Sequence, residues 1–430
     1  MAVYYVPAGV EDYHTTGPAT LYTKLEKHKQ EKTSFLFKAK EWETKDQHIL
    51  LCRHPISEYL PEISYDSCVS IHSPTMLKHL GIKVCLANPQ VGKYSKIPFK
   101  NQGILTILDS GGFQMLSGKM TFVNPDDVVS RYNANADIGM PLDIPVKAIV
   151  EQQFFDRVSR IMKANDNYMI PKLNNDVTLS LISHGTTLDY RKRRLDILDR
   201  DTKVVTIAGL NINPKGSISV LPSKVEQLMY VVSRYRKTTQ YFHVLGVTEK
   251  LFLFLYCLLD SLGYVKNIGA DSVTHRICAL SGNYLKADFS SVILKKDGPY
   301  GKRSECFCPV CRCVHDLRVV HEPLLLETHN LYALVERLKF IHDMSDSYVS
   351  GGVKLKTIYD ELQIRCSFIE FRSLVEYVQE VCANKFKPLT SQIKQGGLFG
   401  HKGVSEQHIK LVKRYEEIIK NYSKFYGKKF

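Results

Sequence analysis

The chain has 430 residues, of which 44% are hydrophobic and 24% charged, and its formal net charge is +14. This composition excludes a largely disordered chain and allows one large core with an appendage. The most apolar run, 251–259, is shorter than the ~20 residues that a membrane-spanning helix needs, so we expect a buried helix there and no membrane partner. Nothing at the N-terminus resembles a secretory signal, and we expect a cytoplasmic protein.

Short apolar or β-branched runs alternate with helix-like stretches along most of the chain. Residues 1–100 contain strand-like pieces at 48–52 and 83–87, which we assign to early strands among loops. Later runs end in polar or glycine residues, at 104–109, 138–143, 179–185, 204–210, 241–247 and 268–273. Helix-like stretches between the runs include 125–135, 151–165 and 221–235. The alternation predicts a parallel sheet, and its many units favour a closed (β/α) barrel over an open sheet.

The carboxyl ends of these runs carry residues that a purely structural strand uses less often than Val or Ile. They are Asp109, Asp143, His184, Gly209 and Asp271. In a parallel barrel the carboxyl ends of all strands meet on one face, and that face holds the chemistry. The sequence therefore predicts a site built from these positions.

One of these strand ends is followed by two glycines, in the sequence Asp109-Ser110-Gly111-Gly112-Phe113-Gln114. Glycines let backbone amides approach a ligand closely, so the segment is a candidate binding loop. A glycine pair after a strand is also typical of a simple tight turn. The local pattern leaves both interpretations open.

Four of the 11 cysteines crowd together, and three of them have the spacing of metal ligands. Cys306-x-Cys308-x2-Cys311 is followed by His329 in the sequence Glu-Thr-His-Asn. Three thiolates and one imidazole complete a tetrahedral zinc site without a position for water, which is typical of structural zinc. We prefer His329 because a helix beginning near it would hold the ring. The competing ligands are Cys313, His315 and His321, and buried or redox-active cysteines are the alternative to a metal site.

The chain changes character after about residue 345. We expect a barrel domain at 1–345, with the zinc site at 306–329, and a basic helical extension at 346–430. Residues 385–430 contain eleven Lys and Arg against three Glu, over half of the net charge. A final helix near 405–425, capped by Ser405, would dock an apolar stripe on the barrel and turn lysines toward nucleic-acid phosphates. The stripe consists of Ile409, Val412, Tyr415, Ile419 and Tyr422.

Several motifs together resemble the tRNA-guanine transglycosylase superfamily. Asp-Ser-Gly-Gly-Phe-Gln at 109–114 is followed much later by Cys-x-Cys-x2-Cys and His-Asn. Gly139-Met-Pro-Leu-Asp143 looks like the archaeal form of the family's base-recognition strand, and Gly269-Ala-Asp271-Ser looks like its nucleophile region. The resemblance covers roughly residues 100–345 and implies a (β/α)8 barrel with a structural zinc insertion.

The resemblance also implies roles for the site residues. Asp109 corresponds to the general acid/base, Asp143 to the carboxylate that reads the base, and Asp271 to the nucleophile. An ionised carboxylate can accept both guanine N1–H and the exocyclic amine, which fits the reading role. The residues that would complete the pocket are Ser110, Gly111, Gly112, Phe113, Gln114, His184, Gly209 and Leu210. His184 stands where the family usually has glutamine, so the incoming base is left open.

Two alignments of the nucleophile region are open. The family pattern Gly-x-Asp-x-Phe-Asp laid on residues 269–274 puts Thr274 at the nucleophile, whereas a three-residue shift puts Asp271 there. We choose Asp271, because a carboxylate can trap an oxocarbenium-like sugar and an unactivated hydroxyl is a poor nucleophile. The Thr274 alignment would suit a silent subunit that binds zinc and nucleic acid beside a catalytic partner. Asp271 as a helix cap or salt-bridge residue is the structural alternative.

The implied reaction replaces guanine in a nucleic acid by a free 7-deazaguanine base, through a covalent aspartyl-glycosyl intermediate. DNA is favoured over tRNA, because the chain lacks the bacterial tRNA enzymes' Pro-Thr-Arg signature and has a short, helical extension. Modification of tRNA, of the queuosine or archaeosine type, is the alternative. If a phage encodes the chain, the expected compartment is the host cytoplasm. The sequence does not identify the target context or decide whether the barrel forms a homodimer.

Overall fold

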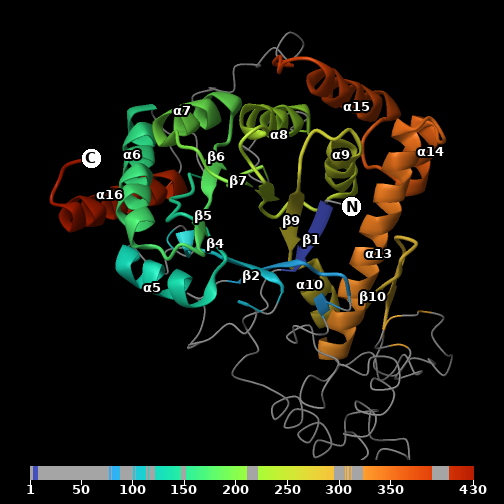
Figure 1. Ribbon diagram of the computed structural model, residues 1–430, viewed down its shortest axis with the longest axis horizontal. Coiled ribbons are helices and arrows are strands. Elements are labelled where there is room, and N and C mark those ends of the chain that lie inside the picture. Colours follow the sequence, from blue (N-terminus) through green and yellow to red (C-terminus); the bar gives the residue numbers. More distant parts are fainter. Residues whose placement is uncertain are drawn as a thin grey trace, which may run out of the picture.

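The computed structural model is a mixed α/β structure in which two parallel sheets lie among helices (Figure 1). It describes residues 3–7, 77–78, 80–87, 100–101, 103–112, 115, 122–146, 152–210, 221–294, 306, 308, 311, 323–389 and 406–430. Among these residues, no helix is both long and apolar enough to cross a membrane.

Within the described part of the chain, nine strands form the two parallel sheets. One sheet has the order β1-β9-β8-β7-β6 and the other β2-β3-β4-β5. The strands are β1 (Val3–Pro7), β2 (Val84–Ala87), β3 (Leu105–Leu108), β4 (Ile138–Gly139), β5 (Thr178–Leu179), β6 (Leu181–His184), β7 (Val204–Ala208), β8 (Tyr241–Val244) and β9 (Ile268–Ser272). The six strand runs expected between 104 and 273 are confirmed as parallel strands, and 83–87 contains β2. The run at 48–52 lies outside the described residues.

The two sheets share contacts at both of their margins. Only Ser180 separates β5 from β6, and β1 contacts β2. A separate cluster of buried side chains draws on strands of both sheets. Its members are Val6, Val84, Leu86, Ile107, Ile138, Met140, Val204 and Tyr241. Side chains from strands of both sheets therefore pack into one shared apolar cluster.

Helices surround the strands (Figure 1). They are α5 (Pro125–Asn135), α6 (Gln152–Met169), α7 (Leu188–Leu198), α8 (Leu221–Tyr235), α9 (Lys250–Ser261), α10 (Thr274–Leu280), α13 (Pro323–Val349), α14 (Leu355–Leu362), α15 (Phe368–Ala383) and α16 (Glu406–Tyr426). The expected helices at 125–135 and 221–235 are confirmed at both ends. The start of α5 is fixed locally, because Pro125 suits a first helical turn and Asn124 accepts a hydrogen bond from the Asp126 amide at 3.0 Å.

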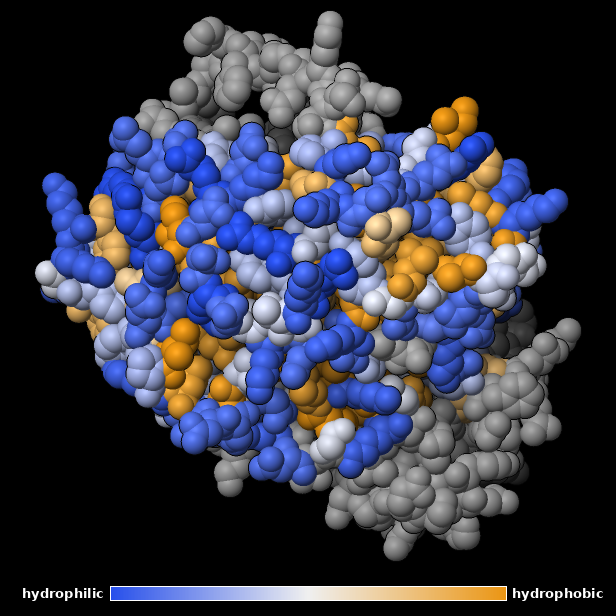
Figure 2. All heavy atoms as spheres, turned by 45° about the horizontal axis from the view of Figure 1, so that its top comes forward, coloured by the Kyte–Doolittle hydropathy of each residue, from blue (hydrophilic) through white to orange (hydrophobic). Residues whose placement is uncertain are grey.

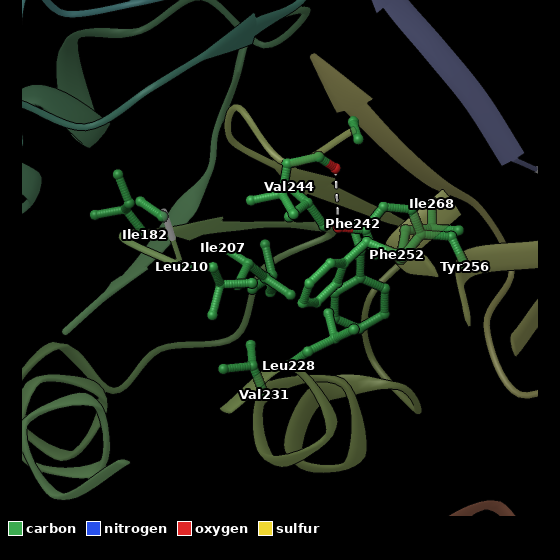
Figure 3. Close-up of a cluster of buried hydrophobic side chains, with 14 of the residues drawn as sticks. Ile182, Ile207, Leu210, Leu228, Val231, Phe242, Val244, Phe252, Tyr256 and Ile268 are labelled. Carbon is green, nitrogen blue, oxygen red and sulfur yellow. Dashed lines mark hydrogen bonds between the residues drawn. The ribbon is translucent and has the colours of Figure 1, made fainter. Parts of the chain in front are cut away.

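The apolar run at 251–259 forms the middle of α9, and all of its residues are buried, as expected. Figure 3 shows Phe252 and Tyr256 of this helix against Phe242 of β8, with Leu228 and Val231 of α8 beside them. The Tyr256 hydroxyl donates to the Val247 carbonyl at 3.2 Å, so its polar end is also satisfied inside the core. The face of the molecule in Figure 2 is largely hydrophilic, with apolar side chains in separate groups.

Helix α13 packs on α9 and α10 and contacts β1 and the antiparallel hairpin of β10 (Asn283–Leu285) and β11 (Ser291–Ile293). The helix expected to begin near His329 begins earlier, at Pro323, since a proline is tolerated in a first turn and apolar residues follow it. The expected domain boundary at 345 falls inside this helix.

The C-terminal helix α16 docks on the rest of the chain through its predicted apolar stripe. Tyr415, Ile419 and Tyr422 are buried, and Val412 is partly buried. The side chain of Ile409, and all of Ser405, lie outside the described residues. Lysines at 413, 420 and 424 are exposed on the opposite side of the helix. The stripe therefore behaves as an amphipathic pattern predicts.

We predict that Gly139→Ala destabilises the protein by about 1–3 kcal/mol, the usual cost of overpacking a core. A Cβ at this β4 position would collide with the fully buried ring of Tyr132, whose hydroxyl donates to the Met140 carbonyl at 2.6 Å and which therefore cannot turn away freely. Urea unfolding measures the change. The control is Gly352→Ala, which should change stability little. Gly352 is exposed, and a Cβ there would lie 3.4 Å from its nearest neighbour, the Ser347 carbonyl oxygen. Equal effects of the two substitutions would contradict this account of β4.

Candidate functional site

The residues expected at strand ends lie along one edge of the sheets. Asp109 directly follows β3, His184 ends β6, and Gly209 directly follows β7. Asp271 is the fourth residue of β9, and Asp143 lies in the irregular segment after β4. Because these strands are parallel, their carboxyl ends face the same way, and the expected positions share that side of the fold.

Asp109 is partly buried beside the backbone of its own loop. Burial raises the pKa of this carboxyl to about 6, although hydrogen bonds from the amides of Gly111 and Ser110 favour the ionised form. The charge of Asp271 raises the pKa further, and that of His243 lowers it. Asp109 is therefore within electrostatic range of Asp271, although the two residues lie on strands of different sheets.

Glycine occupies the two positions after Ser110 for two different structural reasons. Gly111 has a φ of +87°, a conformation that residues with a side chain rarely adopt. A Cβ on Gly112 would collide with the backbone carbonyl of Asp143. The glycine pair thus lets the loop after β3 lie directly against the segment after β4. Phe113 and Gln114 lie outside the described residues.

Asp143 is buried in a charged environment. Its Oδ1 lies 3.4 Å from Nη1 of Arg194, a fully buried residue of α7. Burial raises the pKa of Asp143 to about 6, Arg194 opposes that rise, and the charge of Asp109 adds to it. The amide of Ile144 also favours the ionised form. Asp143 and Asp109 therefore influence each other's protonation.

Arg194 and Arg191 were not foreseen as part of the site. Arg194 Nε donates to Ser159 Oγ at 3.3 Å, and its guanidinium lies 4.6 Å from the ring centre of Phe155. Arg191 donates to the carbonyls of Ser183, Gly185 and Ala208, which belong to the ends of β6 and β7. Two arginines three residues apart share one face of a helix, and that spacing was the available signal. Burial of that face could not be read from the sequence.

His184 is buried near both arginines. Burial, together with the positive charges of Arg194 and Arg191, holds the pKa of this imidazole well below its ordinary value, so the ring is neutral at pH 7. Gly209, with a φ of +80°, lies against the ring. The side chain of Leu210 belongs to the apolar core near Ile207 (Figure 3), which leaves its backbone for any ligand contact.

Asp271 is held by neighbours from β8 and the turn that follows it. Its Oδ1 accepts a hydrogen bond from the Gly246 amide at 2.9 Å and lies 3.3 Å from Nε2 of His243. The other ring nitrogen of His243 shares a hydrogen bond with the Tyr241 hydroxyl at 3.2 Å. His243 was also not foreseen, although strand alternation puts it on the same side of β8 as Tyr241.

Thr274, the alternative nucleophile, begins α10, and its hydroxyl lies 2.6 Å from Ser272 Oγ. The backbone amide of Thr274 also donates to Ser272 Oγ, so Thr274 takes part in a local turn. Of the two candidates, Asp271 bears the charge that acts on Asp109. Asp271 does not cap α10, since Val273 occupies that position, whereas its contact with His243 is of the kind that the salt-bridge alternative describes.

Four residues form a second site, which can hold a metal ion. Cys306, Cys308, Cys311 and His329 offer ligand atoms that all lie within 4.8 Å of one another. The three sulfurs lie 3.6, 3.3 and 3.5 Å from His329 Nδ1. Sulfur and nitrogen bound to one tetrahedral zinc would be about 3.6 Å apart, from bond lengths of about 2.3 and 2.0–2.1 Å. The distances between these sulfur and nitrogen atoms therefore fit tetrahedral coordination of one metal ion. Cys313, His315 and His321 lie outside the described residues.

The surroundings of the cluster orient its ligands. His329 Nε2 lies 2.7 Å from the Leu285 carbonyl, and donation to that carbonyl leaves Nδ1 free to face the sulfurs. The ring stacks on Tyr284 with centroids 3.7 Å apart. Backbone amides of Cys308 and Cys311 donate to the sulfurs of Cys306 and Cys308. These contacts preorganise the donor set.

The cluster also ties α13 to the chain that follows Asp271. Asn330, beside His329, accepts from the Leu285 amide at 2.9 Å and donates to the carbonyls of Asn283 and His275. His275 belongs to α10, which begins three residues after Asp271. A metal at the cluster would thus add to the connection of α13 with β10 and α10.

Comparisons with protein-family models and with curated proteins found no match to this chain.

We predict that Cys308→Ser abolishes stoichiometric metal binding and lowers the midpoint of thermal unfolding, because metal-binding energy contributes to folding. Metal content per chain, measured by elemental analysis, provides the test. Cys366→Ser changes a partly buried thiol outside the cluster and should keep the metal. Retention of the full metal content by Cys308→Ser would rule out the Cys3His site.

We predict that Asp109→Asn stabilises the protein by about 1–3 kcal/mol at pH 7. The folded pKa of about 6 lies above the ordinary 3.8, so folding becomes less favourable as the pH rises from about 4 to 6 and the carboxyl ionises. The gain should disappear toward about pH 3, below the ordinary pKa of 3.8, where the wild-type carboxyl is protonated in both states. Urea unfolding at the two pH values measures it. Asp176→Asn, at an exposed aspartate, is the control and should show no such gain. Destabilisation by Asp109→Asn at pH 7 would contradict the raised pKa of Asp109.

Proposed function

We propose that this chain is a base-exchange transglycosylase that replaces guanine in a nucleic acid by a 7-deazaguanine derivative. The observation that carries the proposal is the grouping of Asp109, Asp143 and Asp271. Asp109 is within electrostatic range of both other carboxylates, and two of the three groups have a pKa raised to about 6. Strongly shifted carboxyls in one place are typical of acid-base sites.

We infer a (β/α)8 barrel as the scaffold. If β5 and β6 are one strand interrupted at Ser180, the order of the described strands is cyclic, from β1 through β9 and back to β1. The shared apolar cluster, with members from six of these strands, has the composition of a barrel interior. All of the proposed catalytic residues would then lie on its carboxyl-terminal face.

In the first step, a carboxylate oxygen of Asp271 attacks C1′ of the guanosine and the bond from C1′ to the base nitrogen breaks. The departing guanine takes a proton from Asp109. In the second step, the incoming base returns a proton to Asp109, its nitrogen attacks C1′, and the bond from C1′ to Asp271 breaks. A pKa near 6 suits this exchange, because Asp109 can then give and take a proton near neutral pH.

Asp143 would read the base. Its ionised carboxylate can accept from guanine N1–H and from the exocyclic amine, and the nearby Arg194 favours the ionised form. The neutral ring of His184 and the backbone at Gly209 and Leu210 would border the same pocket. Both groups lie at strand ends that Arg191 holds together.

Zinc is the metal that we propose for the Cys3His cluster. Three thiolates and an imidazole are a common zinc ligand set and leave no open coordination position. The ion would therefore have a structural role, holding α13 to the hairpin and to α10.

The nucleic acid would bind through basic residues near the site. The exposed side of α16 carries Lys413, Lys420 and Lys424, with Glu416 and Glu417 among them, and the buried side contacts the segment after β4. Lysines in this place can neutralise the phosphates that flank a flipped-out nucleotide. The sequence favours DNA as the polymer, and tRNA is the alternative.

The test is to incubate the purified protein with labelled guanine or 7-cyano-7-deazaguanine and with either duplex DNA or tRNA. We expect label to enter one polymer, DNA first. Labelling of tRNA alone would keep the reaction and change the substrate. Labelling of neither polymer would refute the proposed exchange and would favour the non-catalytic subunit.

We predict that Asp271→Asn abolishes exchange and the covalent adduct, with a loss of at least about 10³-fold. Metal content and the circular dichroism spectrum should not change. Asp288→Asn, an exposed aspartate in the turn between β10 and β11, is the matched control and should keep full activity. Full exchange activity in Asp271→Asn would remove Asp271 from the mechanism.

A further inference from the structure

The segment that carries Asp143 belongs to no helix or strand. Residues 140–146 follow β4 as irregular chain, although most of their side chains are buried. An irregular segment does not gain its orientation from a sheet ladder, so contacts from elsewhere must hold it. Besides the Met140 carbonyl, which accepts from Tyr132, the segment has such contacts at three backbone carbonyls between residues 142 and 145.

Two of these contacts depend on tyrosines of α16, one directly and the other through Asn165. The hydroxyl of Tyr415 donates to the Pro145 carbonyl at 2.9 Å. The hydroxyl of Tyr426 donates to Asn165 Oδ1 at 2.8 Å, and the amide of Asn165 donates to the Leu142 carbonyl at 3.2 Å. Both ends of the stretch from 142 to 145 are therefore connected to one helix, with Asp143 between them.

The third contact comes from the loop after β3. The carbonyl of Asp143 lies against Gly112, which has no room for a Cβ. The loop after β3 and the helix α16 thus hold the segment from two directions. Tyr415 itself is fully buried, and its ring lies edge-on to Phe154 with centroids 5.6 Å apart, so its hydroxyl has a fixed place.

We propose that Tyr415 is a positioning residue for base recognition, which it serves by fixing the backbone at Pro145 and hence the direction of the Asp143 carboxylate. This inference rests on the proposed role of Asp143. A forked pair of hydrogen bonds to a planar base requires both carboxylate oxygens to lie in the plane of the base, and small misplacements are costly. The C-terminal helix therefore belongs to the recognition site, and is more than a cover on the barrel.

Tyr415→Phe is the direct test, because it removes one hydroxyl and keeps the ring. We expect the Kd for free guanine to rise about 5- to 10-fold, the effect of losing one hydrogen bond of ordinary strength. KM for the incoming base should rise similarly while kcat changes less, since Asp109 and Asp271 are untouched. Exchange of the amide hydrogens within residues 142–146, where only Pro145 has none, should become faster.

Tyr422→Phe is the matched control. Tyr422 lies on the same helix, is equally buried, and its hydroxyl also donates to a backbone carbonyl, that of Val123 at 3.1 Å. Loss of this bond should lower stability by a similar amount but leave guanine affinity and amide exchange at 142–146 unchanged. Tyr426→Phe, which acts on the other end through Asn165, provides a second variant if Tyr415→Phe does not fold.

The outcomes separate the two proposals. If the wild-type protein neither binds guanine nor exchanges it, the proposed function fails, and amide exchange at 142–146 still decides whether Tyr415 fixes the segment. If the wild-type protein binds guanine and Tyr415→Phe behaves like Tyr422→Phe in both measurements, the positioning role is wrong. A specific loss of base affinity with faster local exchange supports it.

Discussion

Asp109 and Asp143 are carboxyl groups that the fold buries, partly for Asp109 and almost completely for Asp143, and holds within electrostatic range of each other. Burial and mutual repulsion both oppose ionisation, so the surrounding structure must supply compensation. The amides of Gly111 and Ser110 provide it for Asp109, and the buried guanidinium of Arg194 provides it for Asp143. The loop amides after β3 and Arg194 of α7 thus answer the same constraint.

Burial of these carboxyls prepares them for the proposed chemistry, but it also lowers the stability of the fold. An ionised, buried carboxylate costs folding free energy at neutral pH, whereas an apolar or amide side chain in its place would not. The protein offsets this cost away from the site. Strands of both sheets share an apolar cluster, the middle of α9 is buried, and Asn330, beside the Cys3His cluster, joins α13 to β10. These features stabilise the scaffold without relaxing the charged site.

The site also depends on a segment far away in the sequence. Helix α16 reaches the chain after β4 through Tyr415, which lies 270 residues beyond its partner Pro145. The apolar stripe of this helix would be satisfied by any apolar surface. The tyrosine hydroxyls restrict the docking position more strongly, because each buried hydroxyl needs a hydrogen-bond partner in a particular direction. They fix where the helix docks and which segment it supports.

The sequence determined the strands from 104 to 273, the helices at 125–135 and 221–235, and the cluster of Cys306, Cys308, Cys311 and His329, because these depend on local periodicity, capping and ligand spacing. Only the tertiary structure decided that Arg194 and His243 accompany the aspartates and that α16 supports Asp143. Those contacts join residues from separate elements, and their energies come from burial, which no local pattern specifies. A sequence reveals which residues can do chemistry, whereas packing decides which of them meet.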